Sequence, residues 1–281
     1  MARTTGIPAV KIGLVDGPVS LHPDLAGENV RYIKKGWDGG CSDSHSLACQ
    51  HATFVAGVLS AKRNSTAPAI CPGCTLLVRP IFAEAAGGRG NVPGVNPANL
   101  AAAIIDCVNS GARIINLSLG LSLPSTPGDL AFEQAVDYAA KNGVMVAAAA
   151  GNHGMIGSSA IAVHPWLVPV VACDLLGRPM KESNLSRSIG IRGLSAPGDG
   201  VISLASTKRP VTLRGTSVAV PFVTGAIALL WSEFPSATAA QIKVALTRNP
   251  APGRASIMPP LLDAEMAYQR LIAVRNGGQA A

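Results

Sequence analysis

Short apolar, strand-prone runs recur along the chain, and each ends in a turn made of small or polar residues. Five of them predict strands: residues 9–17 (AVKIGLVDG), 75–82 (TLLVRPIF), 112–120 (ARIINLSLG), 144–152 (VMVAAAAGN) and 167–174 (LVPVVACD). Their apolar residues continue without alternating with polar ones, which is typical of strands that are buried on both faces. We therefore expect these runs to form a sheet inside the protein.

Two segments between these runs predict helices. Residues 98–111 (ANLAAAIIDCVNSG) end at Gly111, and residues 128–143 (GDLAFEQAVDYAAKNG) end at Gly143 with Lys141 in the last turn. A glycine directly after the last turn is a common helix stop. Strands that alternate with helices predict an α/β fold, with three α/β/α layers around a mostly parallel central sheet and right-handed crossovers.

The whole chain, residues 1–281, is predicted to form a single domain. Its length fits one large α/β domain, and no internal repeat, low-complexity tract or linker divides it. We expect a core from about residue 10 to residue 273 and a frayed tail after Arg275. Pro8 and Lys11 interrupt any apolar stretch at the start, so no signal peptide is predicted, which favours the cytoplasm; close cysteine pairs leave secretion open.

Composition and charge exclude several classes of protein. Apolar residues make up 48% of the chain and charged residues 14%, which suits a large core and argues against disorder. The net charge of +7 raises the question of nucleic acid, but the 23 Lys and Arg residues are scattered and only 4% of residues are aromatic. We expect no nucleic-acid partner. We also expect no membrane partner, because no run reaches the roughly 18 uninterrupted apolar residues of a membrane span.

Polar residues at the ends of the predicted strands carry the first functional signal. Ligands of open parallel sheets gather at the carboxyl ends of the strands, which singles out Asp16, Ser118 and Asn152. Two further polar residues begin predicted helices: His51 in QHATFVAG and Ser217 in RGTSVAVPFVTG. Helices that start from the same edge of the sheet would bring Asp16, His51 and Ser217 together.

An aspartate, a histidine and a serine in contact can form an activated nucleophile. A hydroxyl is a poor nucleophile until a base removes its proton, which a neutral imidazole can do near pH 7 while a carboxylate fixes its tautomer. The run after Ser217, VAVPFVTGAIALLW, is apolar on every face, so this helix should be buried and hold the serine still. Pro221 is tolerable near its start, where N–H groups have no helical partner. Taken singly, each residue is more often a turn former, a structural residue or a helix cap.

These motifs resemble those of the subtilase family of serine proteases, from about Val10 to Trp231. GTSVAVPFVTG is similar to the family's GTSMAxPHVAG, and HATFVAG is similar to its HGTHVAG. HPDL at residues 22–25, INLSLG and AAAAGN also resemble subtilase segments. The order aspartate, histidine, serine is that of subtilisin. The resemblance implies a serine endopeptidase that forms an acyl-enzyme with a peptide bound in an extended conformation.

The resemblance also implies a role for each site residue. Ser217 would be the nucleophile, His51 the general acid and base, and Asp16 the group that orients His51. Asn152 would donate its side-chain amide to the oxyanion, together with the backbone N–H of Ser217. Two segments would line the specificity pocket, where a backbone edge can pair with the substrate and small side chains leave space for a larger one: Ser118, Leu119, Gly120, Ala149, Ala150 and Gly151.

The chain departs from the family pattern at three places. Gly17 and Pro18 follow Asp16, where many subtilases have serine or threonine and then glycine, so a hydroxyl that helps to hold the aspartate is missing. Phe54 and Phe222 stand where histidines are usual. We expect these changes to repack the site rather than abolish it.

The sequence DGPV together with HP resembles the cyanobactin type of protease, which removes leader peptides from ribosomal peptide natural products. Macrocyclising relatives carry an added helical cap, for which the stretch between Asp16 and His51 leaves little room, so hydrolysis is expected rather than transpeptidation. Two alternatives stay open: a general degradative protease, and a subtilase-like module that binds peptides without cutting them.

Six cysteines include two close pairs, Cys41 with Cys49 and Cys71 with Cys74, and either pair can form a disulfide. A zinc site made of Cys41, Cys49, His45 and His51 is disfavoured, because metal ligation would occupy the base.

No metal, no organic cofactor and a monomeric state are expected. Many subtilases bind calcium, and Asp24 stands where a ligand can occur in the family. The loop at residues 62–70 (KRNSTAPAI) would have to supply further ligands, but it brings Lys62 and Arg63 and no carboxylate.

Overall fold

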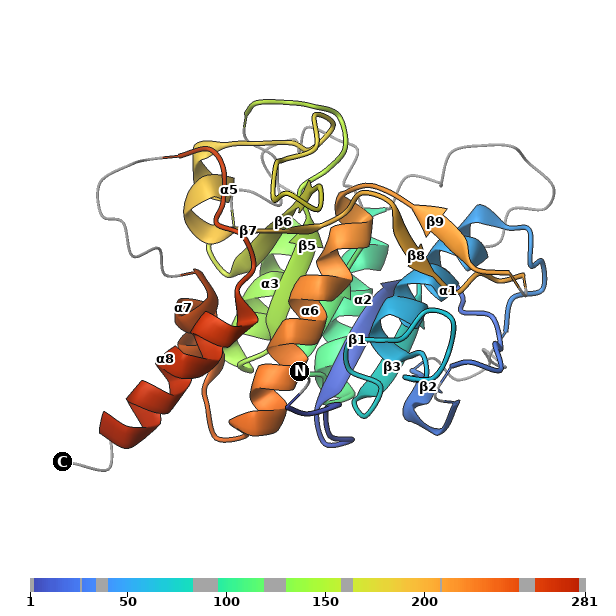
Figure 1. Ribbon diagram of the computed structural model, residues 1–281, viewed down its shortest axis with the longest axis horizontal. Helices are drawn as coiled ribbons and strands as arrows, with labels where there is room; N and C mark the ends of the chain where they lie inside the picture. Colours follow the sequence, from blue (N-terminus) through green and yellow to red (C-terminus); the bar gives the residue numbers. More distant parts are fainter. Residues whose placement is uncertain are drawn as a thin grey trace.

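The computed structural model describes residues 3–25, 27–33, 40–82, 96–118, 130–157, 164–207, 209–247 and 256–277 (Figure 1). Its centre is a seven-stranded sheet in the order β2-β3-β1-β4-β5-β6-β7, in which every neighbouring pair is parallel. The strands are β1 (Lys11–Asp16), β2 (Val30–Tyr32), β3 (Thr75–Pro80), β4 (Ile114–Leu117), β5 (Met145–Ala149), β6 (Leu167–Cys173) and β7 (Leu194–Pro197). The five predicted runs form the strands β1, β3, β4, β5 and β6.

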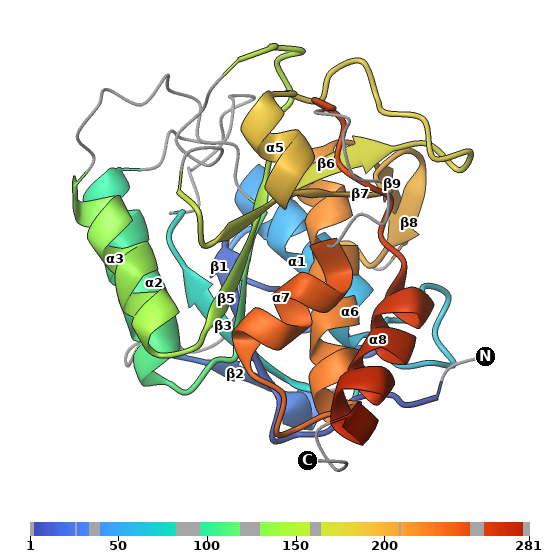
Figure 2. The same cartoon turned by 90° about the vertical axis from the view of Figure 1, so that its left-hand side faces the viewer.

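Helices cover both faces of this sheet (Figure 2). On one face, α2 (Pro97–Asn109) and α3 (Leu130–Lys141) pack into a hydrophobic cluster with the sheet. The other face carries α1 (Leu47–Ser60), α6 (Thr216–Glu233), α7 (Ala239–Thr247) and α8 (Ala264–Gly277), whose apolar residues form the larger cluster. The predicted three-layer α/β/α architecture is therefore confirmed.

Four shorter elements complete the fold. They are the 3-10 helix η1 (Gly27–Asn29), the helix α5 (Arg187–Arg192) and the antiparallel pair β8 (Val201–Ser203) and β9 (Val211–Leu213). At the other end of the chain, α8 continues to Gly277. The two residues after Arg275 still belong to this helix, and fraying of the tail stays a prediction.

The helix α6 is the central buried element of the fold. It contacts β4, β5, β6 and β7, and its Trp231 is completely buried. By length and composition it could cross a membrane, but 72% of its residues are buried inside the protein, as befits a core helix. This burial fixes its N-terminal end against the carboxyl edge of the sheet, where the candidate residues lie.

Candidate active site

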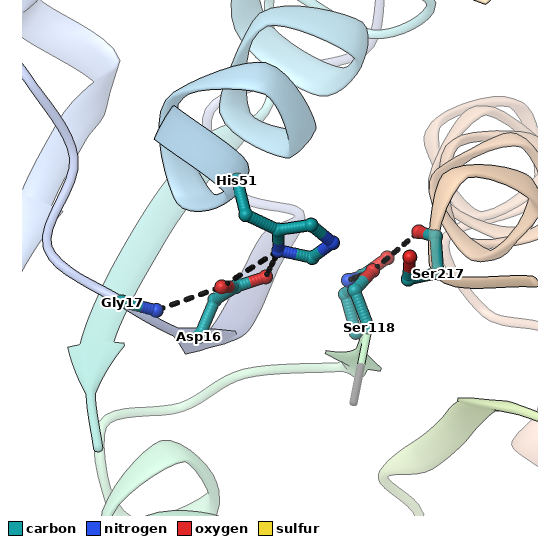
Figure 3. Close-up of polar contacts among 6 residues, drawn as sticks. Asp16, Gly17, His51, Ser118 and Ser217 are labelled. Carbon is teal, nitrogen blue, oxygen red and sulfur yellow. Dashed lines mark hydrogen bonds and ion pairs between the residues drawn. The ribbon is translucent and has the colours of Figure 1, made fainter. Parts of the chain in front are cut away.

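Three elements bring the predicted aspartate, histidine and serine to one edge of the sheet (Figure 3). Asp16 is the last residue of β1, His51 lies in α1, and Ser217 is the second residue of α6. In Figure 3 the imidazole of His51 lies between Asp16 and Ser217. Segments separated by more than 150 residues along the chain therefore meet at this point.

The carboxylate of Asp16 holds the imidazole of His51 at two points. Nδ1 of His51 lies 3.0 Å from Oδ1 of Asp16 and 3.0 Å from Oδ2. A carboxylate only accepts, so Nδ1 carries the proton and Nε2 is left as the acceptor. The Asp16 carboxylate also accepts a hydrogen bond of 2.8 Å from the N–H of Gly17. The pair is protected from water, because the Asp16 side chain is 1% exposed and the His51 side chain 22% exposed.

Two opposing effects set the pKa of His51. Burial of the imidazole lowers the pKa, because it disfavours the charged form. The negative charge of Asp16 and the hydrogen bond to it act in the opposite direction and prevail, so that the pKa of His51 lies above its ordinary value. The imidazole is thus a stronger base than a free histidine.

The nucleophile candidate Ser217 is half-buried in the first turn of α6. The turn is entered through Gly215, whose φ of 126° is a conformation that favours glycine. The carbonyl of Ser217 would ordinarily accept from the N–H four residues on, but that residue is Pro221, which has none. The hydroxyl of Ser118 takes this place and donates a hydrogen bond of 2.8 Å to the Ser217 carbonyl (Figure 3).

The side-chain amide of Asn152 lies beside the start of α6 and is oriented by Thr216. Oδ1 of Asn152 accepts from the Thr216 N–H at 2.8 Å and from the Thr216 hydroxyl at 3.0 Å. Because a backbone N–H can only donate, Oδ1 must face Thr216, and the Nδ2 group of Asn152 must point away from it. Asn152 is exposed. Its amide protons are therefore available to an incoming oxyanion.

The predicted pocket residues that the structure describes are buried, whereas the wall of an open pocket would be exposed to solvent. Ser118 is 3% exposed, and its hydroxyl is used by Ser217. Ala149 and Ala150 are 1% and 2% exposed and pack in hydrophobic clusters. The N–H of Ala150 donates to Val170 and the N–H of Gly151 to the Thr216 hydroxyl. These two N–H groups are therefore already used within the protein, and the pairing of a substrate with a backbone edge of the two predicted pocket segments stays a prediction.

The other predicted pocket wall, Leu119 and Gly120, lies outside the described residues. The presence of a specificity pocket between the two segments stays a prediction.

The departures from the family pattern have a packing explanation. A β-carbon at Gly17 would overlap the carbonyl group of Ala48, in the first turn of α1. Phe54 is completely buried in the larger hydrophobic cluster, and Phe222 is half-buried and packs against the same cluster. The two phenylalanines therefore fill apolar space on the buried side of α1 and α6.

The two cysteine pairs differ. Cys41 and Cys49 form a disulfide, which closes the loop directly before His51, so neither can bind zinc. Cys71 and Cys74 are buried thiols, so the disulfide that their spacing allows is not formed. They lie within hydrogen-bonding reach of each other, which raises the pKa of Cys71 and lowers that of Cys74. Across the described residues, no three histidine, cysteine, aspartate or glutamate side chains are grouped to hold a metal.

The residues around Asp24 do not fit a calcium ion. The ammonium group of Lys62 donates a hydrogen bond of 2.7 Å to the carbonyl of Pro23, and the N–H of Lys62 donates to the Asp24 carbonyl. A lysine side chain thus already places a positive charge on the oxygen atoms of this loop, which disfavours a cation there.

Sequence reasoning missed the residues that support the site from behind. Thr216 fixes Asn152, while Asn116 and Thr224 form buried hydrogen bonds that end on Ser118. All three lie within motifs that carry the resemblance: Asn116 in INLSLG, and Thr216 and Thr224 in GTSVAVPFVTG. Buried hydroxyl and amide groups inside apolar runs such as ARIINLSLG and VAVPFVTG were the available signal, since such groups need partners.

Comparison with known proteins supports this arrangement. The profile of the Subtilase family (Peptidase_S8) matches residues 8–260. Thermitase from Thermoactinomyces vulgaris is 33% identical over 232 residues, which cover 81% of this chain and 77% of that protein. The thermophilic serine proteinase of Bacillus sp. (strain AK1) is 32% identical over 82% of this chain. The chain spans only 54% of the length of that proteinase and 60% of a thermostable alkaline protease from Halalkalibacterium halodurans.

Solved structures share nearly the whole fold. The protease domain of PatA, in a serine-to-alanine mutant, superposes with a TM-score of 0.85 at 28% identity, covering 98% of this chain and 99% of that one. The prenylagaramide maturation protease PagA gives a TM-score of 0.81 at 27% identity, covering 95% and 96% of the two chains. The PatG macrocyclase domain, at 22% identity and a TM-score of 0.82, is similar in fold.

Proposed function

Because this chain belongs to the subtilase family, we propose that it is a serine endopeptidase that hydrolyses peptide bonds through an acyl-enzyme. Ser217 is the nucleophile and His51 is the general acid and base. Asp16 orients the imidazole of His51 and stabilises its protonated form. The observation that carries the proposal is the contact of Nδ1 of His51 with both carboxylate oxygens of Asp16, at 3.0 Å each, which leaves Nε2 directed to the side of Ser217 (Figure 3).

In the first half of the reaction, Oγ of Ser217 bonds to the scissile carbonyl carbon while Nε2 of His51 takes the hydroxyl proton. The imidazolium is stabilised by the buried carboxylate of Asp16. His51 then gives the proton to the departing amine as the C–N bond breaks, which leaves the acyl group on Ser217. In the second half, His51 takes a proton from the water molecule whose oxygen bonds to the ester carbon. His51 then gives this proton to Oγ of Ser217 as the bond between Oγ and the acyl group breaks, which releases the acid and restores the serine.

The negative charge of each tetrahedral intermediate is stabilised at the start of α6. The Nδ2 group of Asn152 and the N–H of Ser217 donate to this oxygen. Thr216 supports the arrangement, because its N–H and hydroxyl hold Asn152 through Oδ1. The N-terminal end of α6 adds its own favourable field for a negative charge.

Labelling with a fluorophosphonate probe tests this proposal. The wild-type protein should react at Ser217, and its peptidase activity should be lost in proportion to labelling. Ser217→Ala should neither label nor cleave, while Ser118→Ala, which keeps the nucleophile, should still label. A wild-type protein that binds peptides and does not react with the probe would instead be a binding module.

We further propose that the substrate is the leader segment of a precursor peptide. The support is the similarity to PatA and PagA, which are described as maturation proteases of patellamide and prenylagaramide. Cleavage-site profiling on a mixed peptide library, with Ser217→Ala as the blank, tests the point. A narrow preference spanning several residues would support maturation, whereas cleavage at many unrelated sites would identify a degradative protease.

A further inference from the structure

We propose that Thr224 is a positioning residue for the nucleophile, acting on Ser217 through Asn116 and Ser118; the inference rests on the proposed function. Thr224 lies two turns into α6 and is completely buried. It is seven residues beyond Ser217 and has no access to the substrate. Its effect is carried by hydrogen bonds alone.

Three successive hydrogen bonds join Thr224 to the nucleophile. The Thr224 hydroxyl donates to Oδ1 of Asn116 at 2.9 Å, and Nδ2 of Asn116 donates to the Ser118 hydroxyl at 2.8 Å. The Ser118 hydroxyl in turn donates to the Ser217 carbonyl at 2.8 Å. Asn116 is completely buried and Ser118 is 3% exposed, so water does not compete for these groups. We call these three bonds the Thr224 relay.

The direction of the relay is set at its Thr224 end. The Thr224 hydroxyl donates to Asn116, which requires the oxygen of the amide to face Thr224 and the NH₂ group to face Ser118. Because the Ser118 hydroxyl then accepts from Asn116, its own proton is directed to the Ser217 carbonyl. Without the Thr224 donor, the amide can turn over and accept the Ser118 proton, which leaves the Ser217 carbonyl without this bond.

The Ser217 carbonyl depends on the Thr224 relay more than other carbonyls of α6 would, because it lacks the usual helical hydrogen bond. The residue four positions on is Pro221, so the helix offers no N–H to the Ser217 carbonyl. The Ser118 hydroxyl therefore fixes the peptide plane between Ser217 and Val218. This plane sets the direction of the Ser217 side chain and of the adjacent backbone. Misplacement of a reacting group by about 1 Å can reduce the rate on the order of 100-fold, so a smaller tilt still has a measurable effect.

Thr224→Val tests the relay, because it keeps the shape of the side chain and removes the donor. We expect kcat, counted per active site titrated with a fluorophosphonate, to fall about tenfold while KM stays within about twofold. Thr224→Ser restores the hydroxyl and should restore kcat. In a Ser118→Ala background, where the relay is already broken, Thr224→Val should lower kcat no further.

A matched control separates positioning from stability. Thr75, on β3, is 3% exposed and its hydroxyl donates to the Pro8 carbonyl at 2.8 Å, away from the site. Thr75→Val should lower the melting temperature as Thr224→Val does but leave kcat per titrated site unchanged. A Thr224→Val protein with wild-type kcat per site, or a Thr75→Val protein with an equal loss, overturns the proposal. If Thr224→Val does not fold, an unchanged kcat in Ser118→Ala overturns it.

A measurement that needs no activity keeps this test separate from the proposed function. The carbonyl carbon resonance of Ser217, observed after selective ¹³C labelling of serine, reports the hydrogen bond from Ser118. We expect it to shift in Thr224→Val and to return in Thr224→Ser. An unshifted resonance overturns the relay, whereas failure of the wild-type protein to cleave or to label overturns only the proposed function.

Discussion

The carbonyl group of Ala48, in the first turn of α1, occupies the space that a β-carbon on Gly17 would need. The residue after Asp16 therefore cannot carry a side chain unless α1 shifts. The Gly17 N–H donates to the Asp16 carboxylate at 2.8 Å, which supplies from the backbone part of the support that a hydroxyl would give. The missing hydroxyl of the family pattern is thus a consequence of the close approach of α1 to β1.

This approach predicts that Gly17→Ser is harmful, although it restores the residue type usual in the family. The overlap should lower the free energy of unfolding by about 1–3 kcal/mol, as overpacking does. It should also lower kcat/KM, because α1 carries His51. Denaturant unfolding and peptide hydrolysis measure the two effects. The control is Gly27→Ser, where a β-carbon meets no described atom within 4 Å. Equal stability and activity of Gly17→Ser and the wild type would contradict this close packing.

The raised pKa of His51 predicts the pH dependence of the reaction. Protonated imidazole cannot accept the serine proton, so kcat/KM should fall as the pH drops through the pKa of His51. That acid limb should lie above pH ~6.5, the ordinary histidine value. In Asp16→Asn, burial becomes the main influence on the pKa of His51, so the acid limb should move to lower pH. We also expect kcat to fall about 10⁴-fold, as it does in another serine protease with these three groups.

The control for this profile is Asp137→Asn. Asp137 pairs with His164 at 3.3 Å, away from His51, so its loss should leave the acid limb in place. An acid limb that stays at the same pH in Asp16→Asn would show that the carboxylate does not control the base.

Much of the fold was predictable because it follows from local patterns. Strands buried on both faces stand out as continuous apolar runs, and both predicted helix stops are glycines with positive φ, 81° at Gly111 and 67° at Gly143. The strands β2, β7, β8 and β9 were not predicted. The strands β2, β8 and β9 have three residues each, of which only Ser203 is buried, and β7 has four residues with the sequence LSAP. None of the four therefore contains an apolar run long enough to mark a strand.

The site likewise has a part that the sequence predicts and a part that only the structure shows. Asp16, His51 and Ser217 stand in motifs that can be recognised along the chain. Their supports are contacts between distant segments: Thr224 and Asn116 are 108 residues apart, and Thr216 and Asn152 are 64 apart. Sequence shows that a buried threonine needs a partner but not which one. Likewise, the sequence offers two close cysteine pairs, and only the fold shows which pair is bonded.

Thiol counting checks the cysteine assignment. Of the six cysteines, Cys71, Cys74, Cys107 and Cys173 are buried thiols, and burial raises the pKa of Cys107 to about 12. The folded protein should therefore react slowly with a thiol reagent. After unfolding, four thiols should react without a reductant and six after reduction. Six thiols in the unreduced protein would show that the disulfide between Cys41 and Cys49 does not form.

Removal of divalent metal should leave the protein unchanged, because Lys62 already contacts the loop of Asp24. A calcium ion held at 100 times its Kd would stabilise the fold by about 2.7 kcal/mol, which its removal would reveal as a drop of a few degrees in Tm. We expect equal Tm and activity with EDTA and with added calcium. A Tm that falls with EDTA and recovers with calcium would place a metal site elsewhere in the chain.

The orientation of Asn152 predicts a loss confined to the transition state. Asn152→Ala removes the Nδ2 donor, so kcat should fall by about 10²–10³-fold, the loss measured for such a donor in subtilisin, with little change in KM. Thr216→Val keeps the N–H but removes the hydroxyl that also holds Oδ1, so its kcat should fall less, by about tenfold. In an Asn152→Ala background the Thr216→Val change should have little further effect on kcat, because there is no amide left to orient. Independent, additive losses would mean that Thr216 acts on the reaction by another route, such as the position of Ser217, and that its contact with Asn152 is not what matters.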